Sequence, residues 1–310
     1  MRHAYLIIAH SNWNQLEMLL HLLDSEDSDI YIHIDKKARD VPTDRLALSI
    51  RYSHIEIYQI FKVYWGSYEM VQTELLLFEE AHKKGYDYYH LLSATDMPIK
   101  PQQYIKDFFE ENAGYEFVHY DTEQRLVADK EIGRRTRLYH FLQNYRNRYR
   151  RKGLNSLFTF LERVSLAAQL LLQIDRTRRY KGFEIKYGSQ WVSITNEFVE
   201  YILSRQELIL KIFRFTNCAD ELFIQSLAYN SPFREKLYNQ KFDGSVLGNM
   251  RLIDMQERSK DGHPYIWRIS DWEEIVGSDC LFARKFSLGA DKEIINRIYR
   301  YVLEEDGDRI

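Results

Sequence analysis

The chain has 310 residues with 43 basic and 46 acidic side chains, so its net charge is −3 and it is no polyelectrolyte as a whole. This length allows one large domain or two small ones. The mean hydropathy is −0.48, and we find no run of about eighteen apolar residues that could span a membrane. The two cysteines, Cys218 and Cys280, exclude a disulfide scaffold and a four-cysteine zinc site, and they fit a reducing compartment.

Short apolar runs alternate with amphipathic segments in the first part of the chain. We interpret the N-terminal run as a strand and not a signal peptide. Strands are predicted over 3–9, 29–34, 55–57 and 87–92, and helices over 13–23 (with Asn12 as its cap), 43–50, 68–83 and a segment through 108–109. This alternation predicts an α/β domain with a mostly parallel sheet flanked by helices. Ligands gather at the carboxyl ends of such strands, where His10, Asp35 and Asp96 lie.

The middle of the chain is basic and largely helical. Residues 134–181 hold thirteen basic and two acidic side chains, a local net charge of +11 that leaves −14 for the rest. An apolar stripe at helical spacing runs through 154–171. A strand over 191–194, helices over 196–213 and 219–228, a loop-rich stretch over 231–277, the segment LFARKF and a helix over 291–304 follow. We find no repeat or linker and expect one continuous domain.

Motifs for familiar cofactors are absent. The chain has neither GxGxxG nor GxxxxGK[ST], and it has no HExxH. Two Asp-x-Asp pairs, at 27–29 and 306–308, have the spacing that can hold a divalent metal. Because the first precedes a strand and the second lies in the C-terminal tail, we expect neither to bind one.

Two charged groups have both a structural and a catalytic interpretation. Glu221 opens a predicted helix, where it either complements the helix dipole or points into a cleft as a general base. Arg284 and Lys285 stand between aromatic residues, where they are either solvated or donors to a diphosphate. Spacing alone leaves both alternatives open.

Taken in order, several segments resemble the core-2/I-branching glycosyltransferase family, which comprises β-1,6-N-acetylglucosaminyltransferases and peptide O-xylosyltransferases. The matching segments are AYLIIAH (4–10), IYIHIDKK (30–37), VYWGSYEMVQTEL (63–75), YHLLSATDMPIK (89–100), GSQWVSIT (188–195), ADELFIQ (219–225), the His263-Pro264 loop and LFARKF (281–286). Residues 124–181 match nothing that we recognise in the family.

The resemblance implies a GT-A-like, Rossmann-type nucleotide-sugar fold, a UDP-sugar donor, inversion at the anomeric carbon, and no metal or other cofactor. It implies a nucleotide-binding half at 1–132, a basic helical insertion at 133–182 and an acceptor and catalytic half at 183–310. Glu221 matches the catalytic base. Donor or UDP contacts are implied for Ile8, His10, Asp35, Asp96, Ser189, Arg268, Arg284 and Lys285. Trp65 and Trp191 are candidate stacking surfaces for an acceptor sugar, or else core residues.

The composition departs from that of the animal enzymes, which have a membrane anchor and many cysteines. We therefore expect a cytoplasmic bacterial relative that builds a surface polysaccharide on a glycan or lipid-linked acceptor, with N-acetylglucosamine, xylose or a hexose as donor sugar. The basic stretch, with arginines at 146, 148, 150 and 151, either contacts an anionic membrane from its inner face or forms a solvated surface.

Two other classes of function compete with the transferase. The first is a protein that binds nucleic acid or an anionic surface through residues 134–181, although the negative net charge and the lack of a known motif disfavour nucleic acid. The second is a glycoside hydrolase, which needs a second carboxylate near Glu221. No partner carboxylate is evident from the sequence.

Overall fold

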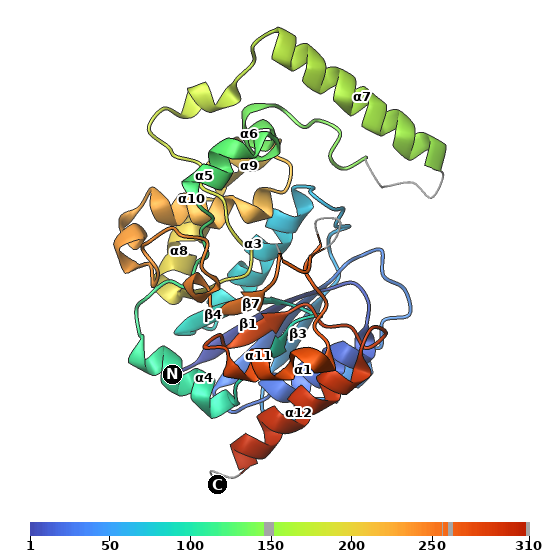
Figure 1. The fold of residues 1–310 in the computed structure, drawn as a ribbon, viewed down its shortest axis with the longest axis vertical. Coiled ribbons are helices and arrows are strands. Elements are labelled where there is room, and N and C mark those ends of the chain that lie inside the picture. The colour runs from blue at the N-terminus through green and yellow to red at the C-terminus, as the bar shows by residue number, and fades with distance from the viewer. Residues whose placement is uncertain (146–151, 256, 260–262, 308–310) are drawn as a thin grey trace.

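The computed structural model describes residues 1–145, 152–255, 257–259 and 263–307. A five-stranded central sheet runs through the middle of the molecule, with helices packed on both of its faces (Figure 1). The predicted α/β architecture, a mostly parallel sheet flanked by helices, is confirmed. The division into two halves and an insertion stays a prediction.

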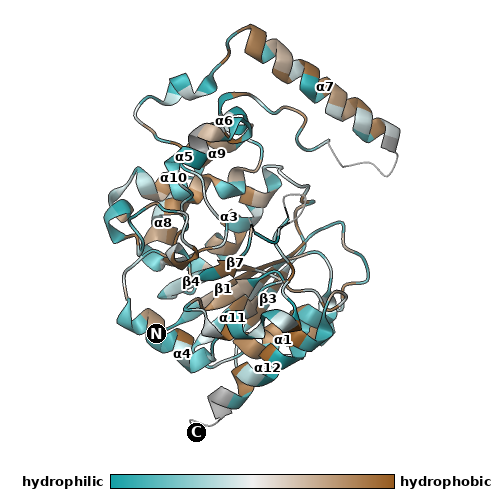
Figure 2. Ribbon diagram, viewed as in Figure 1, coloured by the Kyte–Doolittle hydropathy of each residue, from teal (hydrophilic) through white to brown (hydrophobic). Residues whose placement is uncertain are grey.

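The central sheet has the strand order β3-β2-β1-β4-β6. β6 is antiparallel to β4, whereas the other neighbouring pairs are parallel. The strands are β1 His3–Ala9, β2 Ser28–Ile34, β3 Ile55–Tyr58, β4 Tyr88–Ser93 and β6 Ser193–Thr195. Helices cover both faces of β1, β2 and β4, which is why these strands are nearly continuous apolar runs in the sequence (Figure 2).

The two faces of the sheet carry separate hydrophobic cores. Alternate residues of β1 point in opposite directions, so that Ala4 and Leu6 join one core and Tyr5 and Ile7 the other. The first core includes helices α3 Glu69–His82, α8 Asn196–Ser204, α9 Gln206–Phe213 and α10 Phe223–Tyr229. The second includes α1 Trp13–Leu23, α2 Thr43–Ala47 and α4 Gln102–Glu111.

A second, three-stranded sheet lies next to the carboxyl end of β4. Its order is β5-β8-β7, with β5 Met97–Pro98, β7 Arg251–Ile253 and β8 Phe282–Arg284. β5 follows β4 after a three-residue turn, so this sheet holds its side chains where the central strands end. A third core beneath it contains the fully buried Trp267 and residues of α11 Trp272–Gly277 and α12 Lys292–Gly307.

Several predicted elements have different bounds in the structure. Asn12 precedes α1 but adopts a left-handed conformation (φ 64°), and its side chain does not cap the helix. The helix predicted over 196–213 is broken at Arg205, where the Ser204 hydroxyl donates to the carbonyl of Tyr201 and competes with the helical pattern. The segment 219–228 is a short 3₁₀ turn followed by α10, because Leu222 leaves the helical region.

The basic stretch forms part of a helical layer at one end of the molecule (Figure 1). The layer contains α5 Glu123–Ala128, which precedes the basic stretch, and α6 Lys130–Arg137, in which the stretch begins. It continues with α7 Lys152–Leu171 and a 3₁₀ helix at Arg176–Tyr180. Further 3₁₀ helices are Ala219–Glu221, Pro232–Lys236, Val246–Gly248 and Ile269–Asp271. The predicted membrane contacts Arg146, Arg148, Arg150 and Arg151 lie outside the described residues. Among the described helices, none combines the length and apolar character needed to cross a bilayer.

Arg176 shows that part of the basic stretch is structural. Its side chain is buried and donates to the carbonyl oxygens of Thr136 (2.6 Å) and Ile212 (2.8 Å) and to the hydroxyl of Thr216. Burial lowers the pKa of Arg176 to about 10. This arginine therefore joins α6 to α9 rather than facing solvent.

We expect Arg176→Ala to lower the free energy of unfolding by about 2–4 kcal/mol, because two buried carbonyl oxygens lose their donor and a cavity opens. The matched change Arg178→Ala, at an exposed neighbour, is expected to stay within about 0.5 kcal/mol of wild type. Denaturant unfolding followed by circular dichroism measures both. Equal effects of the two changes would contradict a structural role for Arg176.

Candidate active site

A cavity of about 730 Å³ opens at the carboxyl end of the central sheet. It lies where β1 and β4 end, beside the second sheet and the loop before β6. This volume is within the range of pockets that hold a small organic ligand. Predicted site residues that line it are Ile8, His10, Trp65, Ser189, Trp191, Glu221, Arg284 and Lys285.

The backbone around Glu221 is fixed from two sides. Cys218 adopts a left-handed conformation (φ 51°), and its N–H donates to the carbonyl of Gly66 at 3.0 Å. The N–H of Gly188 donates to the carbonyl of Glu221, also at 3.0 Å. Gly66 and Gly188 belong to two segments that are far from Glu221 in the sequence. The loops of these segments therefore hold the carboxylate at the cavity wall.

The Glu221 side chain forms an ion pair with Arg135 at the edge of the cavity. Its Oε2 lies 2.9 Å from Nη1 of Arg135, which comes from α6, and a third of the side chain remains exposed. Burial raises the pKa of Glu221, while Arg135 and the Tyr187 hydroxyl act in the opposite direction. The result is a carboxylate that binds a proton more readily than an ordinary glutamate.

Two further carboxyl groups lie behind Glu221. Asp220 also lines the cavity, and burial together with the charge of Glu221 raises its pKa. Glu74 of α3 is completely buried, and burial followed by the charge of Asp220 raises its pKa well above the ordinary value. Its Oε1 accepts a hydrogen bond from Nε2 of Gln190 at 3.1 Å. Burial and the repulsion between neighbouring carboxylates therefore both favour the protonated form of Glu74.

Arg284 is clamped at the other end of the cavity. Its Nη1 lies 2.6 Å from Oδ1 of the buried Asp96 and also donates to the hydroxyls of Ser93 and Thr95. Its guanidinium stands 4.4 Å from the centroid of the Trp191 ring. Asp96 and Arg284, which were both predicted as donor contacts, thus form one ion pair that links the second sheet to the end of β4.

Lys285 lines the cavity beside this clamp. Burial, followed by the charge of Arg284, lowers the pKa of Lys285. Within the described residues, its ammonium group forms no ion pair. His10, across from it at the end of β1, has a pKa lowered by burial and raised in part by Asp35. An anion bound here would therefore lie near the ammonium of Lys285, which has no ion-pair partner among the described residues, and near Arg284, which is paired with Asp96.

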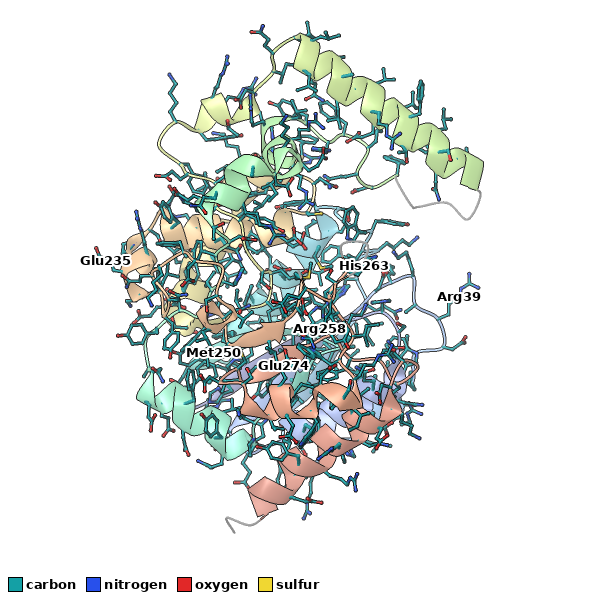
Figure 3. All side chains as sticks on the ribbon, viewed as in Figure 1. Arg39, Glu235, Met250, Arg258, His263 and Glu274 are labelled. Atoms are coloured by element: carbon teal, nitrogen blue, oxygen red, sulfur yellow. The ribbon has the colours of Figure 1, made fainter. Side chains whose placement is uncertain are left out.

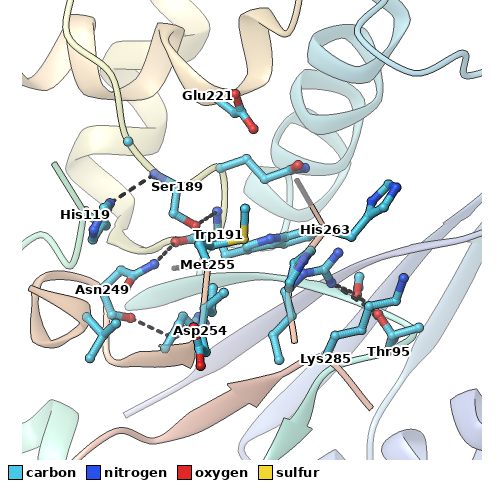
Figure 4. A pocket seen from close by; sticks show the side chains of 18 of the residues that line it. Thr95, His119, Ser189, Trp191, Glu221, Asn249, Asp254, Met255, His263 and Lys285 are labelled. Atoms are coloured by element: carbon cyan, nitrogen blue, oxygen red, sulfur yellow. Dashed lines mark hydrogen bonds between the residues drawn. The ribbon is translucent and has the colours of Figure 1, made fainter. Parts of the chain in front are cut away.

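The arrangement of the polar groups is visible at close range. Glu221 lies at one end of the pocket, and Lys285 with Thr95 lies at the other (Figure 4). Between them, the N–H of Ser189 donates to Nδ1 of His119 at 3.2 Å, and Nδ2 of Asn249 donates to the carbonyl of Trp191 at 2.7 Å (Figure 4). These bonds fix the floor of the pocket.

Three predicted residues are not part of the cavity wall. Asp35 accepts a hydrogen bond from the N–H of Lys37 at 2.9 Å and acts on the site through the pKa of His10. Asp96 lies behind Arg284. Arg268 donates to the carbonyl of Ala290, so its guanidinium is held away from the pocket. The two tryptophans differ, since Trp65 is 65% exposed at the rim whereas Trp191 is 8% exposed beneath Arg284.

Sequence reasoning missed several residues of the site. Arg135 lies in the unmatched basic stretch, and its pairing with Glu221 depends on how α6 packs. Arg251 is fully buried in the cavity wall, donates to the carbonyl of Asn249 (2.8 Å) and has an Nε without a partner among the described residues. Both arginines lie in segments without a recognisable motif, so their spacing gave no signal.

Arg258 and Glu274 form part of the rim, on the same side of the molecule as His263 (Figure 3). The Arg258 guanidinium is already paired with Glu274 (2.8 Å) and with Asp254 (2.8 Å). These carboxylates raise the pKa of Arg258. This arginine therefore shapes the rim and is not a ready partner for an anionic ligand.

The first Asp-x-Asp pair of the sequence, Asp27 and Asp29, does not line the cavity. Asp27 forms an ion pair with Lys106 at 2.9 Å, and Asp29 accepts hydrogen bonds from the N–H of His54 at 2.8 Å and from the hydroxyl of Tyr86. Asp308 of the second pair lies outside the described residues. Across the described ranges, no group of three His, Cys, Asp or Glu side chains is placed to hold a metal ion.

The sequence model of the Core-2/I-Branching enzyme family matches residues 3–277. The chain belongs to this family. The family is one of glycosyltransferases, which take a sugar donor and an acceptor. The resemblance recognised from the ordered motifs is confirmed at the level of the family.

Curated relatives of this family member are distant. Xylosyltransferase 1 of Homo sapiens is 23% identical over 327 residues, which cover 97% of this chain and 30% of the human protein. Xylosyltransferase oxt of Drosophila melanogaster is 25% identical over 317 residues, which cover 94% of this chain and 32% of that protein. The chain thus spans about a third of the length of the curated relatives that it matches.

Solved structures give a weaker likeness to this family member. The mannosyltransferase Ktr4p of S. cerevisiae has a TM-score of 0.33 and 14% identity, covering 72% of this chain and 65% of that one. The apo form of mouse xyloside xylosyltransferase 1 has a TM-score of 0.30 and 10% identity, covering 74% and 81%.

We expect Gly188→Ala to destabilise the protein by about 2 kcal/mol or more, because the added Cβ would lie 1.9 Å from the carbonyl oxygen of His119. The loop must then move and loosen its bond to Glu221. Gly133→Ala in α6, where nothing lies within 4 Å, is the control and should stabilise the helix by about 0.5–1 kcal/mol. Thermal unfolding of both variants decides, and a Gly188→Ala protein as stable as wild type would contradict the close packing.

Proposed function

We propose that the chain is an inverting UDP-sugar transferase that works without a metal ion and moves one sugar to a hydroxyl group of a glycan or glycoconjugate. The observation that carries this proposal is the placement of Glu221 and Lys285 at opposite ends of one cavity. A transferase of this kind needs a base at the acceptor and positive charge at the leaving diphosphate. The pocket offers both, one at each end.

Glu221 is proposed as the general base. It takes the proton of the acceptor hydroxyl while that oxygen forms a bond to the anomeric carbon of the donor. The bond from this carbon to the diphosphate oxygen breaks in the same displacement, and UDP leaves with the electron pair. One base is sufficient for this reaction, and no sugar–enzyme bond forms. The raised pKa of Glu221 suits a group that must accept a proton near neutral pH.

Lys285 and Arg284 are proposed to bind the diphosphate. Lys285 offers an ammonium beside the cavity, and a dianionic ligand would oppose the burial that lowers its pKa. Arg284 is already held by Asp96, Ser93 and Thr95, so its remaining donors point in a fixed direction before any ligand binds. Fixed cations stabilise charge that develops on a leaving group, as a metal ion would.

The rest of the pocket divides between donor and acceptor. Ile8 and His10 at the end of β1, near Asp35, are proposed to contact the nucleotide, and Ser189 the donor sugar. Trp65 is proposed to stack against an acceptor sugar, because its ring is exposed at the rim. Arg268 would need to leave the Ala290 carbonyl before it could reach the nucleotide.

For the donor sugar, we propose N-acetylglucosamine as the first candidate and xylose as the second. The first follows from the family resemblance, and the second is supported by the names of the curated relatives. We further propose a cytoplasmic bacterial enzyme of surface-polysaccharide synthesis that uses a lipid-linked acceptor.

One observation supports the hydrolase alternative and another opposes it. The structure places the carboxyl group of the neighbouring residue Asp220 in the cavity lining together with Glu221. Membership of a glycosyltransferase family favours transfer over hydrolysis.

We expect calorimetry with a panel of UDP-sugars to detect binding that EDTA does not change and that identifies the donor sugar. Lys285→Ala should weaken this binding by about tenfold or more, because an ion pair with the diphosphate is lost. Lys62→Ala, at an exposed lysine outside the cavity wall, is the matched control and should bind as wild type. Binding that requires Mn²⁺ would refute the metal-free mechanism, and no binding of any uridine nucleotide would refute the UDP-sugar assignment.

We expect Arg135→Met to move the acid limb of the kcat/KM profile to higher pH. Arg135 favours the charged form of Glu221, so without it the pKa of Glu221 rises further and the carboxylate becomes protonated at a higher pH. Arg134→Met is the control, because that arginine pairs with the exposed Glu131. Glu221→Gln should reduce kcat by about 10²-fold or more with donor binding retained. An acid limb that Arg135→Met leaves in place would contradict the role of Glu221 as the base.

A further inference from the structure

Helix α7 is amphipathic, but it packs with its polar side toward the protein. Glu162 is buried, and its carboxylate accepts hydrogen bonds from the N–H of Leu142 and lies 3.1 Å from Nδ1 of His140. Gln169 is also buried, accepts from the N–H of Tyr139 (2.7 Å) and donates to its carbonyl (2.9 Å). Hydrogen bonds from polar side chains therefore attach this helix to the segment between α6 and α7.

The opposite side of α7, which we call its outer face, is apolar and exposed. Leu157 is 48% exposed, Phe160 is 60% exposed and Leu171 is 85% exposed. At 100° per residue, the outer face covers an arc of roughly 200°. Its apolar members, all exposed, are Leu154, Leu157, Phe160, Leu161, Val164, Ala167, Ala168, Leu170 and Leu171.

This orientation is the reverse of what burial in a globular protein produces. A surface helix normally turns its apolar stripe to the core and its polar side to water. Figure 2 shows α7 as a helix rich in apolar residues that stands at the edge of the molecule, beyond α6 and α9. A contiguous exposed apolar face of this size marks a surface that binds something.

The charges around the outer face have one sign. The acidic residue of α7, Glu162, is buried on the inner side. Arg163 lies at the edge of the outer face, and Arg178, Arg179 and Lys181 are exposed soon after the helix ends. The rest of the chain is acidic, so an anionic surface attracts this end of the molecule and repels the remainder.

We propose that the outer face of α7 binds the surface of an anionic lipid bilayer, with the helix lying in the plane of the headgroups. The apolar arc then enters the boundary between headgroups and acyl chains, and the neighbouring cations meet the anionic lipids. A helix of 20 residues provides a contact about 30 Å long.

Two other occupants fit the observations less well. A second copy of the chain would bring two segments of the same strong positive charge together, and a helix pair needs a seam much narrower than this arc. Nucleic acid binds through cations and polar groups, whereas the outer face presents leucine, valine, alanine and phenylalanine. A lipid surface is the partner that matches both the apolar arc and the charge.

The placement of α7 also gives the bound enzyme an orientation. His140, which contacts Glu162, also contacts the carbonyl of Arg134 in α6 at 3.3 Å, and the next residue, Arg135, pairs with Glu221. The bilayer would thus lie on the side of the pocket that holds Glu221, where a lipid-linked acceptor would enter. This orientation rests on the proposed function, whereas lipid binding itself does not.

Vesicle flotation of the full chain tests the proposal, with vesicles of phosphatidylcholine alone and of phosphatidylcholine mixed with phosphatidylglycerol. We expect salt-sensitive binding to the mixed vesicles. Changing Leu157, Leu161 and Val164 together to Gln should reduce it by about tenfold or more, as should the pair Arg178→Glu and Arg179→Glu. The assay contains no sugar nucleotide, so its failure leaves the proposed transferase untouched.

Matched controls separate this surface from general effects of hydrophobicity and charge. Leu48, Leu210 and Leu303 are exposed leucines elsewhere on the molecule, and their joint change to Gln should leave binding unaltered. Arg39 extends into solvent from the loop after β2 (Figure 3), and Arg39→Glu with Arg51→Glu should also have no effect. Circular dichroism checks folding. If the variant changed at Leu157, Leu161 and Val164 unfolds, the comparison of the two charge variants decides.

Several outcomes would overturn the proposal. Wild-type protein that floats with neither vesicle, or α7 variants that bind as wild type does, would exclude a lipid contact at this face. A wild-type dimer that the triple variant converts to a monomer, without vesicle binding, would assign the outer face to a second copy. Salt-sensitive binding of duplex nucleic acid in place of vesicles would assign the basic residues to a nucleic acid.

Discussion

The ion pair between Arg284 and Asp96 joins the two sheets of this molecule at the site. Asp96 follows the last strand of the parallel run, and its carboxylate also accepts hydrogen bonds from the N–H and hydroxyl of Ser93, both at 2.8 Å. Removing either partner would leave an unpaired charge in a buried place, which is more costly than removing the pair together. Lys285 is the next residue along the chain, so its position depends on the same contact.

One end of the pocket holds carboxyl groups and the other holds basic groups. At both ends, burial shifts the pKa values in the direction that favours the neutral form. Burial raises the pKa of Glu221, Asp220 and Glu74 at one end. It lowers the pKa of Lys285 and His10 at the other. A pocket of this kind favours a ligand that brings negative charge to one end and a proton donor to the other. A sugar nucleotide together with an acceptor alcohol has both properties.

The sequence predicted the elements whose signal is local. The buried strands β1, β2 and β4 and the helices α1 and α3 were found from their hydrophobic patterns. Ile8 and His10 reach the cavity because parallel strands end at one edge of the sheet. Glu221 and the Arg284–Lys285 pair were singled out because their segments match a family in order. The break at Arg205 was missed because it depends on one side-chain hydrogen bond that periodicity does not register.

Contacts between distant segments were beyond sequence reasoning. Arg135 pairs with Glu221 across 86 positions, and Arg251 reaches the carbonyl of Val192 and the hydroxyl of Ser193 from a loop-rich stretch. Arg268 illustrates the converse, since a cation near a family motif can be held elsewhere by a backbone carbonyl. Such residues are identified only when the fold brings them together.

The reversed packing of α7 has a consequence for the behaviour of the protein in solution. Without a surface to cover it, the outer face exposes to water an area that other molecules of the same protein would also shield, and the basic residues beside it keep those molecules apart only at low ionic strength. Colloidal stability should therefore fall as salt rises, the opposite of what simple charge attraction would give. Recombinant material is best concentrated in dilute buffer, and mild detergent should recover material that salt precipitates.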